Sequence, residues 1–235
     1  MRRIQEADRI SSAESGSSKS APPDFDNLVQ VYRWMEYSSF GPYLERCRFW
    51  FLGAVGERRH ALVLGDGDGR FTARLLAQSP DLRVHAIDGS AGMLAALRRR
   101  ARRYADRLTT EQADLRRWWP AAQTAAPEII VSHFFLDCLT TEEVAALATR
   151  LAGSCAPNAL WLVSEFAIPV TGWMQRVARP LITLLYRAFR LLTNLGPQRL
   201  PDYAAALEAS GWRLEAERQH LHGLLVSQLW RAPKS

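Results

Sequence analysis

The chain has 235 residues, of which 48% are hydrophobic and 23% are charged, a balance typical of a folded globular protein with a substantial core. Its three cysteines follow no metal-ligand spacing and form no even set for disulfides, so the sequence argues against a disulfide-stabilised scaffold and favours a reducing, cytoplasmic environment. No apolar run reaches the roughly 18 residues that a membrane-spanning helix needs.

The net charge of +6 is concentrated in one segment. Five of the 30 basic residues are arginines that fall within residues 98–103. Apolar residues recur around them at helical spacing, which predicts that the arginines occupy the solvent-facing side of a helix. Because no nucleic-acid-binding module accompanies this charge, a nucleic-acid partner is not expected, and an anionic surface is the weaker alternative.

The first part of the chain divides into a tail and a helical segment. Residues 1–23 are rich in Ser, Pro and charge and predict a disordered tail. The basic residues after Met1 precede polar residues instead of an apolar core, so a secretory signal peptide is not expected. Residues 27–37 and 42–52 predict helices, and the segment 24–56 predicts a helical lid ahead of a main domain over 57–233.

The start of the main domain predicts a nucleoside-binding βαβ unit. Its strand, helix and second strand are expected at His60–Leu64, Arg70–Gln78 and Arg83–Asp88. Between the first strand and the helix lie Gly65, Gly67 and Gly69, which allow backbone conformations and close approaches that a Cβ would block. Asp88 ends the second strand, where its carboxylate can accept hydrogen bonds from both ribose hydroxyls.

The spacing of the glycines distinguishes between nucleosides. A dinucleotide loop reads G-x-G-x-x-G, but Arg70 stands at its third glycine position. The observed G-x-G-x-G suits a loop that passes an adenosine with an amino-acid tail instead of a pyrophosphate. An NAD(P)-dependent oxidoreductase is therefore the weaker alternative.

The remaining elements alternate as a doubly wound α/β sheet requires. Thr140 and Glu143 form a capping box that opens one of the helices, and Gly153 closes that helix. Strands are expected at Leu108–Gln112, 128–133 and Leu160–Phe166, helices at 91–106, 171–194 and 202–210, and a closing antiparallel hairpin at 212–217 and 224–230.

Residues 61–88 resemble motif I of class I S-adenosylmethionine (SAM)-dependent methyltransferases, and residues 85–94 (HAIDGSAGML) resemble the second-strand motif of that family. The similarity spans about residues 25–231. It implies a Rossmann-like seven-stranded sheet of order 3-2-1-4-5-7-6 with the last strand pair antiparallel, SAM as cofactor and methyl transfer as the reaction. One position departs from the family: Val63 stands where an acid is usual, and the acids lie inside the loop at Asp66 and Asp68. This departure keeps a non-catalytic SAM-binding module open as an alternative.

The resemblance also implies which residues bind SAM. Asp66 or Asp68 would meet the amino-acid tail, directly or through water, and Tyr32 would lie beside the same tail. Asp114 would accept a hydrogen bond from the adenine amine. The full predicted set is Tyr32, Gly65, Asp66, Gly67, Asp68, Gly69, Asp88, Gly89, Ser90, Met93, Asp114, Leu115, His133 and Phe134.

The acceptor side is expected where the fourth strand ends, because open α/β sheets bind ligands at the carboxyl ends of their strands. His133 and Asp137 are the predicted catalytic residues, and His133 could take a proton from a phenol or enol. Structural roles for both residues are the alternative. No residues have metal-ligand spacing, so no metal is expected.

The insertion at about 171–200 is apolar with interleaved arginines. With the LPDY sequence that ends at Tyr203, it is faintly similar to the ubiquinone and menaquinone biosynthesis methyltransferases. That similarity implies a small, apolar or aromatic acceptor. A peripheral membrane contact through 171–194 and a buried lid helix are the two alternatives for this segment.

Overall fold

The computed structural model describes residues 41–120, 125–168 and 201–233. The predicted tail at 1–23, the helix at 27–37 with Tyr32, and the insertion at 171–194 lie outside the described residues. The predicted domain boundaries are therefore described only in part.

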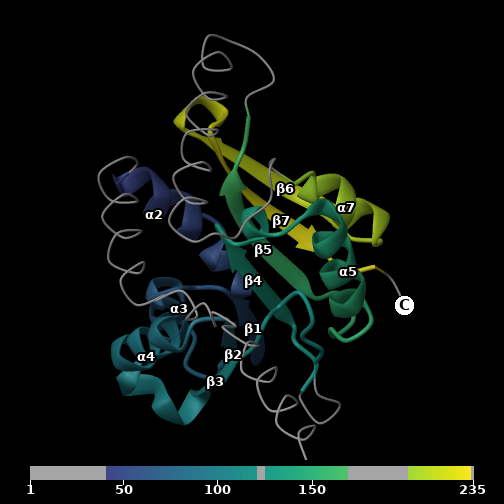
Figure 1. Cartoon of the computed structure of the whole chain (residues 1–235). Helices are drawn as coiled ribbons and strands as arrows, with labels where there is room; N and C mark the ends of the chain where they lie inside the picture. The colour runs from purple at the N-terminus through teal and green to yellow at the C-terminus, as the bar shows by residue number, and fades with distance from the viewer. Residues whose placement is uncertain (1–40, 121–124, 169–200, 234–235) are drawn as a thin grey trace, which may run out of the picture.

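The core is a seven-stranded sheet of order β3-β2-β1-β4-β5-β7-β6, which confirms the predicted fold (Figure 1). β7 pairs antiparallel with both β5 and β6, and the other neighbours are parallel. The strands are β1 His60–Leu64, β2 Arg83–Asp88, β3 Leu108–Gln112, β4 Ile129–His133, β5 Leu160–Phe166, β6 Arg213–His220 and β7 Leu225–Arg231.

Helices cover both faces of the sheet, as the doubly wound arrangement requires (Figure 1). α3 and α4 pack on the face that carries Val63, and α5 and α7 pack on the face that carries Leu64. The α-helices are α2 Gly41–Phe49, α3 Arg70–Gln78, α4 Ala91–Arg100, α5 Thr141–Ala152 and α7 Tyr203–Ala209. The short 3-10 helices are η1 Leu52–Val55, η2 Arg102–Arg107, η3 Leu136–Cys138 and η4 Leu221–Gly223. No helix among the described residues has the length and apolar character to cross a membrane.

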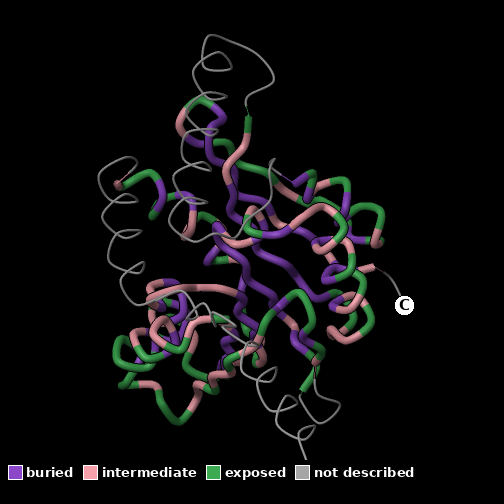
Figure 2. The backbone as a smooth tube through the Cα atoms, in the orientation of Figure 1, coloured by how far each residue is buried: buried purple, intermediate pink, exposed green. Residues whose placement is uncertain are grey.

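The central strands β1 and β4 are buried along most of their length (Figure 2). Their side chains alternate between the two faces, so each strand contributes to both hydrophobic clusters. β1 and β4 are neighbours in the sheet although their connections leave in different directions. Because β1 pairs parallel with both β2 and β4, the carboxyl ends of the three strands lie on one edge of the sheet, where the glycine loop also lies.

The predicted helix at 91–106 is wrong beyond Arg100. The chain continues as η2, with Tyr104 at a non-helical φ of −123°. The Arg107 guanidinium explains the tighter path, because it donates to the carbonyl oxygens of Leu76, Ser79 and Leu82 at distances of 2.9–3.1 Å. These bonds satisfy acceptors at the end of α3, which an α-helix otherwise leaves without partners.

Hydroxyl groups of β5 and β7 hold α2 against the sheet. The carbonyl oxygen of Cys47 accepts hydrogen bonds from the Oγ atoms of Ser164 in β5 (3.2 Å) and Ser227 in β7 (2.7 Å). His220 Nε2 lies 2.9 Å from the same Ser227 Oγ. The helix is therefore fixed over the carboxyl edge of the sheet, next to the end of β4.

Candidate cofactor and acceptor site

The loop between β1 and α3 depends on its glycines. Gly65, Gly67 and Gly69 have φ values of 64°, 57° and 79°, in the region that L residues rarely adopt. A Cβ on Gly65 would lie 2.5 Å from Phe135 Cδ2, and one on Gly69 would lie 2.8 Å from Leu97 Cα. The loop thus needs glycine both for its conformation and for its close packing.

Gly67 differs from its two neighbours because an added Cβ there would meet no clash. The atom nearest to an added Cβ would be Met93 Sδ, at 3.7 Å. That distance is an ordinary van der Waals contact, so the positive φ and not close packing explains the glycine at this position.

Asp88 lies beside this loop at the end of β2, as predicted. Its Oδ1 accepts a hydrogen bond from Ser90 N at 2.8 Å, and Gly65 N donates to the carbonyl oxygen of the preceding residue, Ile87, at 2.9 Å. Burial raises the pKa of Asp88 to about 6, although the backbone N–H groups of Ser90 and Gly67 act in the opposite sense. Ser90 in turn caps α4 by accepting from Met93 N at 3.2 Å.

The two acids of the loop, Asp66 and Asp68, have different hydrogen-bond partners. Asp66 Oδ2 accepts from both the backbone N (2.8 Å) and Oγ1 (2.7 Å) of Thr72, whereas Asp66 Oδ1 is buried and has no hydrogen-bond partner in the part of the chain that the structure describes. Burial raises the pKa of Asp66, and the charge of Arg48 opposes that rise. Asp68 instead accepts from Arg100 Nη2 (2.7 Å) and Arg70 Nε (3.4 Å), so it ties the loop to α4.

The predicted adenine-binding residues follow β3 on the same edge. Ala113 N donates to the carbonyl oxygen of Asp88 at 3.2 Å, which brings the next residue, Asp114, close to the end of β2. The carboxylate of Asp114 is half-exposed and accepts from Arg116 N (3.1 Å) and Nε (2.8 Å), and these bonds lower its pKa. Leu115 is buried and its carbonyl oxygen accepts from Arg150.

His133 lies at the end of β4 and is only 5% exposed. Its ring lies edge-on to that of Phe71 with centroids 4.5 Å apart, and neither ring nitrogen has a hydrogen-bond partner among the described residues. Burial holds the pKa of His133 well below its usual value, and the charge of Arg48 lowers it further. His133 is therefore neutral at physiological pH, so one of its ring nitrogens carries a lone pair.

The residue after His133 has a strained backbone. Phe134 has a φ of 55°, which a phenylalanine adopts at a cost of about 1–3 kcal/mol. Phe134 N donates to the carbonyl oxygen of Ser164 at 2.7 Å, and its ring lies 5.3 Å from that of Phe166. Such strain is typical of functional sites, and here it turns the chain sharply at the edge where the acceptor is expected.

Two charged residues at this edge were missed in the sequence. Arg48 of α2 lies with its guanidinium carbon 5.6 Å from the centroid of the Phe134 ring. Glu165 of β5 is fully buried, and its pKa is raised well above its usual range by burial and by the neighbouring charge of Asp137. The signal for Glu165 was a lone acid in the apolar strand LWLVSEF, whereas nothing in the sequence marked Arg48.

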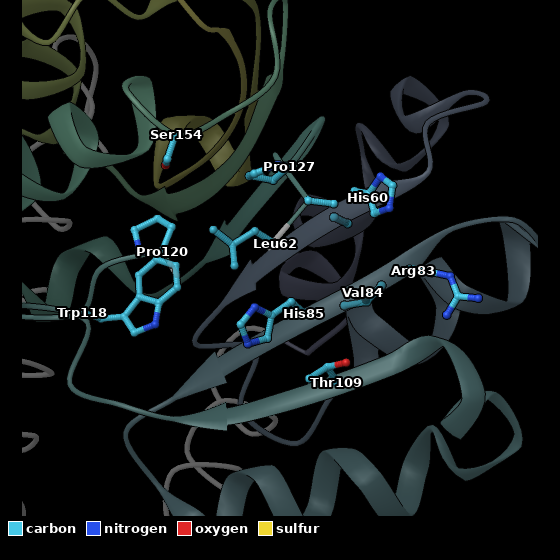
Figure 3. Close-up of a pocket in the computed structure, with 12 residues that line it drawn as sticks. His60, Leu62, Arg83, Val84, His85, Thr109, Trp118, Pro120, Pro127 and Ser154 are labelled. Carbon is cyan, nitrogen blue, oxygen red and sulfur yellow. The ribbon is translucent and has the colours of Figure 1, made fainter. Parts of the chain in front are cut away.

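A separate cavity of about 440 Å³ opens at the other end of the sheet (Figure 3). It is lined by His60 and Arg83, where β1 and β2 begin, and by Trp118, whose ring lies edge-on to that of His85 with centroids 6.4 Å apart. His85 pairs with Glu111 at 3.0 Å. None of the predicted site residues lines this cavity, so it is distinct from the candidate cofactor site.

The fold and the loop define a Rossmann-like enzyme of the methyltransferase class. A family model described as a methyltransferase domain matches residues 61–158. The chain belongs to the class I SAM-dependent methyltransferases, and SAM is its cofactor. The alternatives of an NAD(P)-dependent oxidoreductase and of a non-catalytic module gain no support.

Relatives and solved structures agree with this assignment. The chain is 30% identical over 198 residues to a trans-aconitate 2-methyltransferase of Mycobacterium sp. (strain KMS), covering 80% of this chain and 72% of the relative. An O-methyltransferase family protein from Burkholderia thailandensis has a TM-score of 0.64 at 17% identity, over 90% of this chain and 59% of that one. The N-methyltransferase NodS from Bradyrhizobium japonicum WM9, in complex with S-adenosyl-L-homocysteine (SAH), has a TM-score of 0.56 at 15% identity, over 83% and 89% of the two chains. This chain thus spans about three fifths of the Burkholderia structure.

Proposed function

We propose that SAM binds at the edge formed by the glycine loop, Asp88 and the end of β4, and that its methyl group passes to a small molecule held beside His133. SAM supplies both the methyl group and its leaving group, so the protein has mainly to bind, orient and exclude water. The observation that carries this proposal is the meeting of Asp88 with the glycine loop, whose Gly67 N–H donates to the Asp88 carboxyl group, at the carboxyl edge of the sheet.

The adenosyl part is assigned to residues on β2, α4 and the segment after β3. The carboxylate of Asp88 accepts hydrogen bonds from the two ribose hydroxyls, because it ends its strand directly beside the loop. Gly89, Ser90 and Met93 flank the adenine ring. Asp114 accepts from the adenine amine, and the Leu115 backbone lies next to it.

The amino-acid tail is assigned to Asp66 and Arg48. Asp66 Oδ1 is a buried carboxylate oxygen without a partner, and a bound ammonium group would supply one. Arg48 carries the opposite charge close by, as its effect on the pKa of Asp66 shows, and it suits the carboxylate of the tail. Asp68 is occupied by Arg100 and serves the loop instead. Tyr32 remains a prediction, since it lies outside the described residues.

His133 and Asp137 are assigned to the acceptor. Neutral His133 presents a ring nitrogen that can take the proton of an acceptor hydroxyl as the methyl group is transferred. Phe134 lines the adjoining wall. Asp137 lies in η3, half-buried and near Glu165, where it would orient a polar group of the acceptor.

The acceptor is proposed to be small and apolar or aromatic. Supporting this, the rings of Phe134 and Phe166 pack against each other and against the leucines Leu44, Leu224 and Leu225 at the same edge. A small carboxylic acid is the second candidate, because the Mycobacterium relative is a trans-aconitate 2-methyltransferase and Arg48 offers a cation beside Phe134. The α2 part of the proposed lid at 24–56 lies over this edge, whereas the insertion at 171–194 and its membrane contact remain predictions.

Binding of SAH tests the cofactor site without knowledge of the acceptor. We expect micromolar affinity by calorimetry, and Asp88→Ala should weaken it at least about tenfold, or about 1.4 kcal/mol. Asp81→Ala is the matched control and should bind SAH normally, because Asp81 is exposed and lies just before β2 begins, at the end of the strand opposite to Asp88. Unchanged affinity in Asp88→Ala would remove Asp88 from the site.

Formation of SAH from SAM then tests the acceptor. Apolar phenols and trans-aconitate should be compared as methyl acceptors at equal concentration. Turnover with the phenols supports the first candidate, and turnover with trans-aconitate alone replaces it by the second. His133→Phe should lower turnover while leaving SAH affinity within about threefold; equal loss of both would make His133 a binding residue only.

A further inference from the structure

Glu165 is a fully buried acid in an otherwise apolar strand. It is the penultimate residue of β5 and is 0% exposed. Burying a carboxyl group costs several kcal/mol unless hydrogen bonds compensate. The position of those hydrogen bonds shows what this residue does.

These hydrogen bonds come from the backbone of the turn that follows β4. Glu165 Oε1 accepts from Phe135 N at 3.0 Å and from Leu136 N at 2.7 Å. The same turn contains the strained φ of Phe134. One carboxyl oxygen therefore satisfies two successive backbone donors and holds the strained turn in place.

The turn presses against the glycine loop. The Phe135 ring lies so close to Gly65 that an added Cβ would be 2.5 Å from Phe135 Cδ2 and 2.9 Å from Phe135 Cγ. Phe135 therefore forms the surface on which the first residue of the loop rests. A continuous series of contacts runs from Glu165 through Phe135 to Gly65.

We propose that Glu165 is a positioning residue for SAM, acting through Phe135 to set the conformation of the glycine loop. The proposal rests on the placement of SAM at that loop under the proposed function. Glu165 itself need not touch the cofactor.

The neighbouring Asp137 makes a precise variant available. Burial and the charge of Asp137 raise the pKa of Glu165 well above its usual range, against the opposing effect of the backbone N–H groups, and so favour the neutral carboxyl form. A neutral carboxyl group and an amide have nearly the same shape, and both offer one carbonyl oxygen to Phe135 N and Leu136 N. Glu165→Gln should therefore keep the function, whereas Glu165→Ala should lose it.

The test measures SAH affinity by calorimetry and stability by urea unfolding on each variant. We expect Glu165→Ala to weaken SAH binding about tenfold and Glu165→Gln to stay within about threefold of the original protein. Glu128→Ala is the matched control, since it also removes a carboxyl oxygen that accepts from two backbone N–H groups, those of Arg59 (2.7 Å) and His60 (3.2 Å), but at the opposite end of β1, and it should lower stability without changing SAH affinity. Glu165→Leu, which fills the space without an acceptor, replaces Glu165→Ala if the latter does not fold.

A double-mutant cycle with Phe135→Leu tests the route. If Glu165 acts through Phe135, the SAH affinity of the double variant should be close to that of whichever single variant binds SAH less tightly. Independent, additive losses would overturn the proposal, as would normal SAH binding by a folded Glu165→Ala or Glu165→Leu protein. Normal binding by Asp88→Ala would instead overturn the proposed site, so the two failures are distinguishable.

Discussion

Replacing Gly69 by alanine should be far more costly than replacing Gly67 by alanine. Both residues have a positive φ, at 79° and 57°, so each substitution carries a backbone cost of about 1–2 kcal/mol. They differ in what the new methyl group meets. At Gly69 it would lie 2.6 Å from Leu97 Cγ and 2.8 Å from Leu97 Cα, and at Gly67 it would lie 3.7 Å from the flexible end of Met93.

The contact with Leu97 sets the size of the difference. Overpacking of a closed site costs about 1–3 kcal/mol, and here one of the clashing atoms is backbone, which cannot turn aside. Gly69→Ala should therefore lower the free energy of unfolding by about 2–5 kcal/mol, and Gly67→Ala by about 1–2 kcal/mol. Gly53→Ala, where the structure shows neither positive φ nor an atom within 4 Å, should change it by less than about 0.5 kcal/mol.

Urea unfolding followed by tryptophan fluorescence measures all three variants, and SAH affinity is measured alongside. Gly67→Ala should weaken SAH binding about tenfold or more, because its methyl group enters the space proposed for the ligand. Equal losses of stability for Gly67→Ala and Gly69→Ala would refute the packing argument. Normal SAH binding by Gly67→Ala would refute the proposed path of the cofactor along the loop.

Two further predictions concern the pH dependence of binding and the cap of α5. Because Asp88 has a pKa of about 6 and binds the ribose as a carboxylate, SAH affinity should fall about tenfold per pH unit below 6. The folding stability of the free protein depends on pH in the opposite direction. Because burial raises the pKa of Asp88, its contribution to the free energy of unfolding is present at low pH and is lost as pH rises through about 6. Affinity in Asp88→Asn should be low and insensitive to pH over that range; a slope equal to that of the original protein would assign the titration elsewhere. Thr140→Ala should lower the free energy of unfolding by about 1 kcal/mol without altering SAH affinity, because the bond from Glu143 N to Thr140 Oγ1 (3.2 Å) caps α5 and involves none of the residues assigned to SAM; an unchanged urea midpoint would contradict this role.

The fold was predictable because local signals and the family motif agree. The bounds of β1, α3, β2 and β5 are those that the sequence predicts, since each has a clear apolar pattern or a glycine boundary, and those of β3 also agree although LTTEQ is only weakly marked. The strand order came from the resemblance, because a hairpin pattern does not say which strand it joins. η2 could not be predicted, since the bonds of Arg107 to the end of α3 join residues far apart in the sequence.

The site was predictable where function depends on position along a strand. Asp88 and the glycines meet as expected because β1 and β2 are adjacent and parallel. The separate roles of Asp66 and Asp68 could not be foreseen, since they depend on which partner each oxygen finds. Glu165 was missed for the same reason: its importance comes from two backbone donors about 30 residues away.

The attachment of α2 has a consequence for the order in which the molecule is built. Cys47 emerges early from the ribosome, but the hydroxyls that hold its carbonyl oxygen follow 117 and 180 residues later. Domains whose contacts join distant residues fold slowly, and their partners must wait exposed. α2 therefore reaches its final position only once β7 has been synthesised. A nascent chain that ends before β7 would contain the nucleoside-binding strands β1 and β2 without α2 fixed over the carboxyl edge.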